Sequence, residues 1–157
     1  LCCELKNKEI MTNRFNQAID RLITAFFNET LTKGECDKCA VGNIVGNKNW
    51  SEVFLSAHGR QYFKYVDGPV PTIIQRGIDD IEATGYSVKE MARIEFAFEQ
   101  STHFDKMDYN LGKISHDEFI QDQFNGLCAV VELLCEFEGI TDVQYYKNML
   151  REKAEVE

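Results

Sequence analysis

The sequence predicts an all-α fold, a compact single-domain bundle of about six or seven helices. Apolar residues recur at helical spacing through most of the 157 residues. Several Ser, Thr or Asn residues stand three positions before a Glu or Gln, directly ahead of such apolar runs, which is the spacing of a helix capping box. Only residues 60–66 combine strand-like composition with alternation, so we expect at most a minor extended or hairpin segment there.

The first helix is expected from Phe15, where apolar residues follow the i, i+3, i+4, i+7 pattern of an amphipathic helix. These residues are Phe15, Ala18, Ile19, Leu22, Ile23 and Phe26. Gly34 is expected to end the region that follows. Asp37 is the expected N-cap of a short helix that carries Cys39 and Ile44.

Later helix starts are predicted from capping-box spacing. The pairs are Asn49 with Glu52, Ser87 with Glu90, Ser115 with Glu118, and Thr141 with Gln144. A further helix is expected to begin near Pro71–Thr72, and Gly85 and Gly139 are placed to end helices. The polar stretch 103–113 is expected to be the longest loop.

Domain organisation is expected to be simple, with one helical domain over residues 11–157. Met11 has the look of a natural start, so residues 1–10 are interpreted as an extension or a cloning remnant. Leu1–Ile10 carries Glu4, Lys6, Lys8 and Glu9 where a signal peptide needs an apolar run. No apolar run reaches the ~20 residues that span a bilayer. We therefore expect a cytoplasmic protein with reduced cysteines.

The net charge of -9 argues against a general nucleic-acid binder or a binder of anionic membranes, since the long-range field repels phosphates. It permits basic partners, so we expect a protein partner rather than a membrane or a nucleic acid. The sequence does not indicate an oligomeric state.

Cys36 and Cys39 form a Cys-x-x-Cys pair with the spacing of two zinc ligands. Cys128 and Cys135 lie seven residues apart on one expected helix, about 10.5 Å at 1.5 Å rise per residue. Thiolates on one zinc lie roughly 4 Å apart, so only one of these two can join the pair. The candidate zinc set is Cys36, Cys39, His58 and Cys128, with Cys135 as the alternative to Cys128. The competing and favoured interpretation is that these cysteines are small buried hydrophobic residues.

Gly42 and Gly46 follow directly with G-x-x-x-G spacing, which indicates close packing, and the helix of Cys128 is the expected neighbour. A candidate partner surface lies further on, where basic and aromatic side chains alternate without an acid. It comprises Trp50, Arg60, Tyr62 and Lys64. The competing interpretation is that these residues form the edge of the hydrophobic core, with the charged ends of Arg60 and Lys64 reaching out to solvent.

Two stretches, C-D-K-C-A-V-G-N-I-V-G at 36–46 and F-N-G-L-C-A-V-V-E-L-L-C at 124–135, resemble a group of small uncharacterised proteins. That group occurs in Bacteroidota genomes and in their phages and mobile elements. The motifs at 58–59 and 85–95 also fit this resemblance. It implies a short intracellular, phage-related protein, and it implies no activity, fold or ligand.

The function expected from these features is a non-catalytic binding or adaptor protein, in which zinc would be structural. Signatures of common enzyme classes are absent from the sequence. One alternative is an acidic decoy that inhibits a nucleic-acid-processing host enzyme. A second is a thiol-based redox protein that uses Cys36 and Cys39, which is weakened because no strand precedes the motif.

Overall fold

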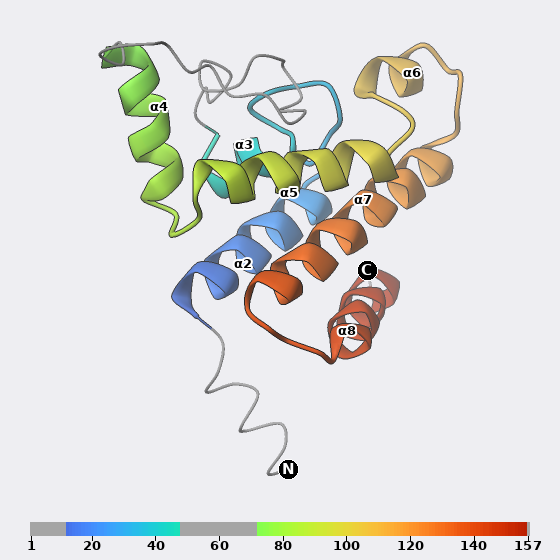
Figure 1. Ribbon diagram of the computed structural model, residues 1–157. Coiled ribbons are helices and arrows are strands. Elements are labelled where there is room, and N and C mark those ends of the chain that lie inside the picture. Colours follow the sequence, from blue (N-terminus) through green and yellow to red (C-terminus); the bar gives the residue numbers. More distant parts are fainter. Residues whose placement is uncertain (1–11, 48–71, 157) are drawn as a thin grey trace.

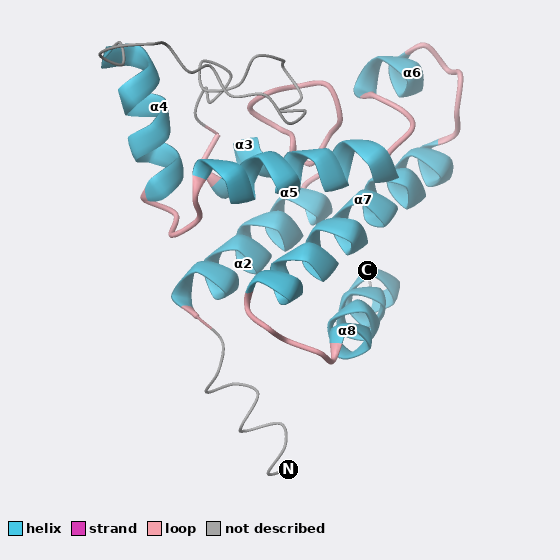
Figure 2. Ribbon diagram, viewed as in Figure 1, coloured by secondary structure: helices cyan, strands magenta, loops and turns pink. Residues whose placement is uncertain are grey.

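The computed structural model describes residues 12–47 and 72–156, and seven helices lie in these two ranges (Figure 1). They are α2 (Asn13–Phe27), α3 (Ala40–Ile44), α4 (Thr72–Glu82), α5 (Val88–Ser101), α6 (Lys106–Asn110), α7 (His116–Phe137) and α8 (Val143–Val156). Within these ranges there is no strand (Figure 2), and one isolated parallel bridge joins Lys33 and Asp105. The all-α prediction is confirmed. The extended segment predicted at 60–66 lies outside the described residues.

Helix α7 is the centre of the bundle, and it contacts α2, α5 and α8. Helix α5 crosses α7 in the most extensive contact between two elements (Figure 1). The short α3 packs against both α2 and α5, and α4 packs against α5. The apolar stripes of these helices meet in one core, which includes Phe15, Leu22, Ile44, Ile94, Phe98, Leu127, Val131 and Leu134.

Two of the predicted capping boxes are present, at the starts of α5 and α7. Ser87 Oγ accepts from the Glu90 amide at 3.1 Å, and Glu90 Oε1 accepts from the Ser87 amide at 2.9 Å. Ser115 and Glu118 repeat this exchange. Gly139 ends α7 as predicted, with a φ of +66° that favours glycine.

Three local predictions are wrong. Helix α3 begins after Cys39, whose thiol takes the capping role expected of Asp37. Helix α8 is capped by Asp142, which accepts from the Tyr145 amide at 3.2 Å, and not by Thr141. The expected loop at 103–113 contains α6, which starts with a capping box between Asp105 and Asp108. In α6 and α8 aspartates take these capping positions, because a carboxylate oxygen accepts a hydrogen bond from an unpaired amide as well as a hydroxyl does. The Asn49–Glu52 pair lies outside the described residues.

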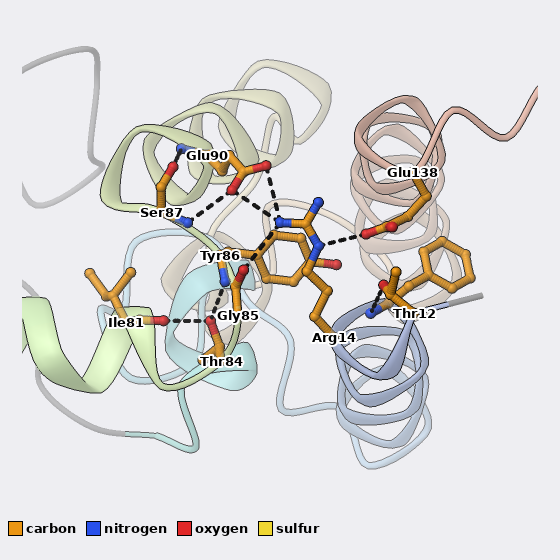
Figure 3. Close-up of polar contacts among 10 residues, drawn as sticks. Thr12, Arg14, Ile81, Thr84, Gly85, Tyr86, Ser87, Glu90 and Glu138 are labelled. Atoms are coloured by element: carbon orange, nitrogen blue, oxygen red, sulfur yellow. Dashed lines mark hydrogen bonds and ion pairs between the residues drawn. The ribbon is translucent and has the colours of Figure 1, made fainter. Parts of the chain in front are cut away.

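Arg14 on α2 joins three parts of the chain that are far apart in the sequence (Figure 3). Its Nε donates to Glu138 at the end of α7 at 2.7 Å, and its Nη1 reaches Glu90 of α5 at 3.2 Å. The same Nη1 donates to the Gly85 carbonyl at 3.1 Å, and the guanidinium lies 4.5 Å from the centre of the Tyr86 ring. The Glu138 side chain is only 5% exposed, and the Arg14 guanidinium is its ion-pair partner.

Replacing Arg14 with Gln is expected to lower the free energy of unfolding by about 2–4 kcal/mol, because it leaves the buried Glu138 carboxylate without its cation. Arg93 provides a matched control, since it pairs with Glu136 at 3.1 Å and lies over the Phe137 ring. That pair is more than half exposed, so Arg93→Gln should cost less than about 1 kcal/mol. Urea unfolding of both variants checks this, and equal small losses would contradict it.

Candidate functional site

The Cys-x-x-Cys segment forms a buried junction between α3 and α5. The Cys39 thiol accepts from the Gly42 amide at 3.4 Å and donates to the Cys36 carbonyl at 3.4 Å. Glu95 of α5 is 1% exposed and accepts from the Val41 amide at 3.3 Å. A thiol and a carboxyl group therefore satisfy two amides in the first turn of α3, which would otherwise have no partner within the helix.

Asn43 and Gly42 hold the Cys-x-x-Cys loop against α3. The buried Asn43 side-chain amide donates to the carbonyls of Thr30, Lys38 and Cys39 at 3.0, 2.9 and 3.0 Å. A Cβ atom on Gly42 would lie 2.3 Å from the Cys36 carbonyl oxygen, so only glycine fits. The close packing predicted for Gly42 and Gly46 is present only at Gly42, where the neighbour is the backbone of its own loop and not the Cys128 helix. Among the described residues, no atom lies within 4 Å of a Cβ placed on Gly46.

The electrostatics of this junction favour neutral groups. Burial raises the pKa of Glu95 to about 8. Burial, and next the nearby Glu95, raise the pKa of the Cys39 thiol well above its ordinary value. The pKa of Cys36 is raised by burial, by Glu95 and by Asp37. Reactive thiols have lowered pKa values and electropositive surroundings. The thiols of this junction are therefore better suited to hydrogen bonding between α3 and its neighbours than to acting as nucleophiles.

The structure does not bring Cys128 together with Cys36 and Cys39. Cys128 lies on α7 and lines a separate groove with Lys147 and Arg151 of α8. Across residues 12–47 and 72–156, no three His, Cys, Asp or Glu side chains lie close enough together to hold a metal ion. His58 lies outside these ranges, as do Trp50, Arg60, Tyr62 and Lys64. The zinc set and the basic–aromatic partner surface stay predictions.

A feature that the sequence did not indicate is the α6 arm, residues 103–114, between α5 and α7. Its first amides, those of His103 and Phe104, donate to the Asp122 carboxylate at 2.9 Å each. Gln123 Nε2 donates to the Phe104 carbonyl at 3.3 Å. Asp122 and Gln123 are both buried in α7, so the base of the arm is attached to the centre of the bundle.

The inner side of the α6 arm is held by an aromatic stack. The Tyr109 ring lies on the Phe119 ring of α7, with centres 5.2 Å apart and planes 17° from parallel. Lys106 Nζ lies 5.4 Å from the centre of each ring, at cation–π distance. The outer side carries Met107 and Leu111, which are 66% and 64% exposed. No residue of α6 is buried.

Comparisons with protein-family models, with curated proteins and with solved structures give no match. Of the helices that the structure describes, none is both long enough and apolar enough to cross a membrane.

The raised pKa of Glu95 predicts a specific dependence of stability on pH. Between the ordinary value of 4.5 and about 8, the folded protein binds a proton that the unfolded chain releases. The free energy of unfolding should therefore be highest below pH 4.5 for this group, and should fall as the pH rises to 8, by on the order of 1 kcal/mol per pH unit at most.

Glu95→Gln should flatten this part of the pH profile, because a neutral amide occupies the same buried position at every pH. Glu152→Gln, an exposed change of the same kind, should keep the profile of the unmodified protein. Denaturant unfolding at a series of pH values checks both. An unchanged slope in Glu95→Gln would show that another group titrates.

Proposed function

We propose that this protein is a non-catalytic binding protein that recognises a protein partner through the α6 arm. Met107 and Leu111 are the anchors that enter the partner. The proposal keeps the binding or adaptor role expected from the sequence and assigns it to a different surface.

The observation that supports it is an exposed apolar pair on a short ordered helix and its C-cap, in which no residue of the helix is itself buried. Single exposed apolar side chains are ordinary on protein surfaces. Met107 and Leu111 differ because they lie one helical turn apart and are the two most exposed large hydrophobic residues in the described ranges. Their support is already ordered by Asp122, Gln123 and the Tyr109–Phe119 stack. Preorganisation of this kind lowers the entropy cost of binding.

The charges near the pair indicate the chemistry of the partner. Residues 103–118 contain four carboxylates, Asp105, Asp108, Asp117 and Glu118, against two lysines, Lys106 and Lys113. Lys106 lies over the aromatic stack, and Lys113 pairs with Asp108 at 3.5 Å. The partner best suited to this surface has an apolar cleft with basic residues at its rim, and the net charge of -9 would speed its approach.

The two alternatives receive less support. An acidic decoy needs its carboxylates on one face, whereas exposed carboxylates occur on α2, α4, α7 and α8. Several of the surface carboxylates are paired with lysine or arginine, as in Glu132 with Lys147 and Glu136 with Arg93. A redox role would need a thiol with a lowered pKa, and burial acts in the opposite direction on Cys36 and Cys39. The phage-related origin, the cytoplasmic location and the zinc stay predictions from the sequence.

A photo-crosslinking residue at position 107 should capture one protein from a lysate of the source organism, because this side chain would lie inside the complex. The same residue at position 145 is the matched control, since Tyr145 is a large apolar side chain with 44% exposure on α8. Capture is measured by mass spectrometry.

The captured protein is then purified and its affinity for the unmodified chain is measured. Met107→Ser with Leu111→Ser should weaken binding by about 100-fold or more, as expected for two anchor residues, and should leave the unfolding midpoint nearly unchanged. Tyr145→Ser should have little effect on affinity. Equal capture from positions 107 and 145, or an affinity that the double variant does not change, would refute the proposal.

A further inference from the structure

A groove of about 530 Å³ runs along α7 beside α8, on a surface that the proposed function does not use. Its floor is a stripe of side chains on α7, Ile120, Phe124 and Cys128, spaced by four residues and therefore on one face of the helix. All three are partly exposed. Phe26 of α2 closes one side of the floor, and its ring centre lies 5.7 Å from that of Phe124. The volume is within the range of small-molecule sites.

The wall on the α8 side carries two cations, Lys147 and Arg151, one helical turn apart. Lys147 Nζ pairs with Glu132 at 2.9 Å, so this lysine is already partly neutralised. Arg151 is exposed, and no ion pair involving it is found within the described residues. Glu132 also lines the groove, so its two cations and one carboxylate leave a net charge of +1 beside the apolar floor. The overall charge of the protein is -9.

The positive charges of Lys147 and Arg151 act on Cys128, which is one of the three floor residues. Burial raises the pKa of its thiol, Lys147 and Arg151 act in the opposite direction, and Glu132 again raises it. The comparison is Cys36, which is also partly exposed and whose pKa is raised by burial, by Glu95 and by Asp37. Two cations therefore act on Cys128, whereas the groups identified as acting on Cys36 are carboxyl groups.

We propose that this groove binds an amphipathic anion, a molecule with an aliphatic or aryl tail and a single carboxylate. The tail lies over Phe124 and Ile120, and the carboxylate contacts Arg151 and Lys147. The apolar floor and the two cations together favour this class of ligand. An uncharged apolar molecule would make no ion pair with Arg151 or Lys147, and a small anion without a tail would not cover the apolar floor. From Cys128 to Ile120 the stripe is about 12 Å long, at 1.5 Å rise per residue, which suits a medium-length acyl chain. This site is independent of the α6 arm.

The first test uses the thiol as a reporter of charge. The protein is alkylated with iodoacetate, which is anionic, and with iodoacetamide, which is neutral and similar in size, and the rates at Cys128 and Cys36 are read by peptide mapping. The ratio of the iodoacetate rate to the iodoacetamide rate should be about fivefold higher at Cys128 than at Cys36, the effect of one nearby unit charge in water. Equal ratios at the two thiols would overturn the proposed anion preference.

The second test adds the tail, with decanoate as the probe below its micelle concentration. Decanoate should slow the alkylation of Cys128 by iodoacetamide and leave Cys36 unaffected. Acetate, which lacks the tail, and decyltrimethylammonium, which carries the opposite charge, should give no protection. Protection by decyltrimethylammonium equal to that by decanoate would show a plain apolar cleft and overturn the proposal, as would no protection by decanoate.

Arg151→Glu tests the assigned cation. This side chain is exposed, so the variant should keep its unfolding midpoint, yet lose both the iodoacetate preference and the protection by decanoate. Arg76→Glu, an exposed substitution of the same kind on α4, should retain both. If Arg151→Glu keeps both the iodoacetate preference and the protection by decanoate, the anion preference has another cause and the proposed site is wrong.

Discussion

The close approach of α5 and α7 at Gly126 is the constraint on which the rest of the structure depends. A Cβ atom at this position would lie 2.5 Å from Thr102 Cγ2 and 2.8 Å from Phe98 Cδ2, so the side chains of α5 pack directly on the backbone of α7. This contact sets both helices at a fixed distance. Helix α5 then carries Glu95 to α3, and α7 carries Asp122 to the base of the α6 arm. The two polar connections follow from one apolar contact.

The Cys-x-x-Cys motif, the most conspicuous feature of the sequence, has a structural role in this fold. Cys36 and Cys39 lie in a junction where burial and neighbouring carboxyl groups keep the thiols protonated, and where Cys39 replaces the usual oxygen at an N-cap. The two surfaces that we propose for binding lie elsewhere, on the α6 arm and in the groove beside α8. Both combine exposed apolar side chains with an ordered support, and they differ in the sign of the nearby charge.

Much of the fold could be predicted from the sequence, because long amphipathic helices and Ser-x-x-Glu caps are local signals. Ser87, Ser115 and Gly139 are examples where local chemistry and the final structure agree. Helix α6 could not be predicted in this way, since five residues show no period and its cap uses Asp108 where Glu or Gln is usual. The burial of Glu95 was visible only as a carboxyl group on the same stripe as Met91 and Phe98. Its partner, the Val41 amide, is 54 residues away.

We infer that α6 is a rigid support that holds Met107 and Leu111 in solvent before any partner binds. The most direct measurement is ¹⁵N relaxation of the backbone amides of residues 106–111 in the free protein, compared with those of α7. Attachment through Asp122, Gln123 and the Tyr109–Phe119 stack predicts order parameters of about 0.85, equal to those of the central helix. Values below about 0.6 would show a flexible loop and would contradict the account.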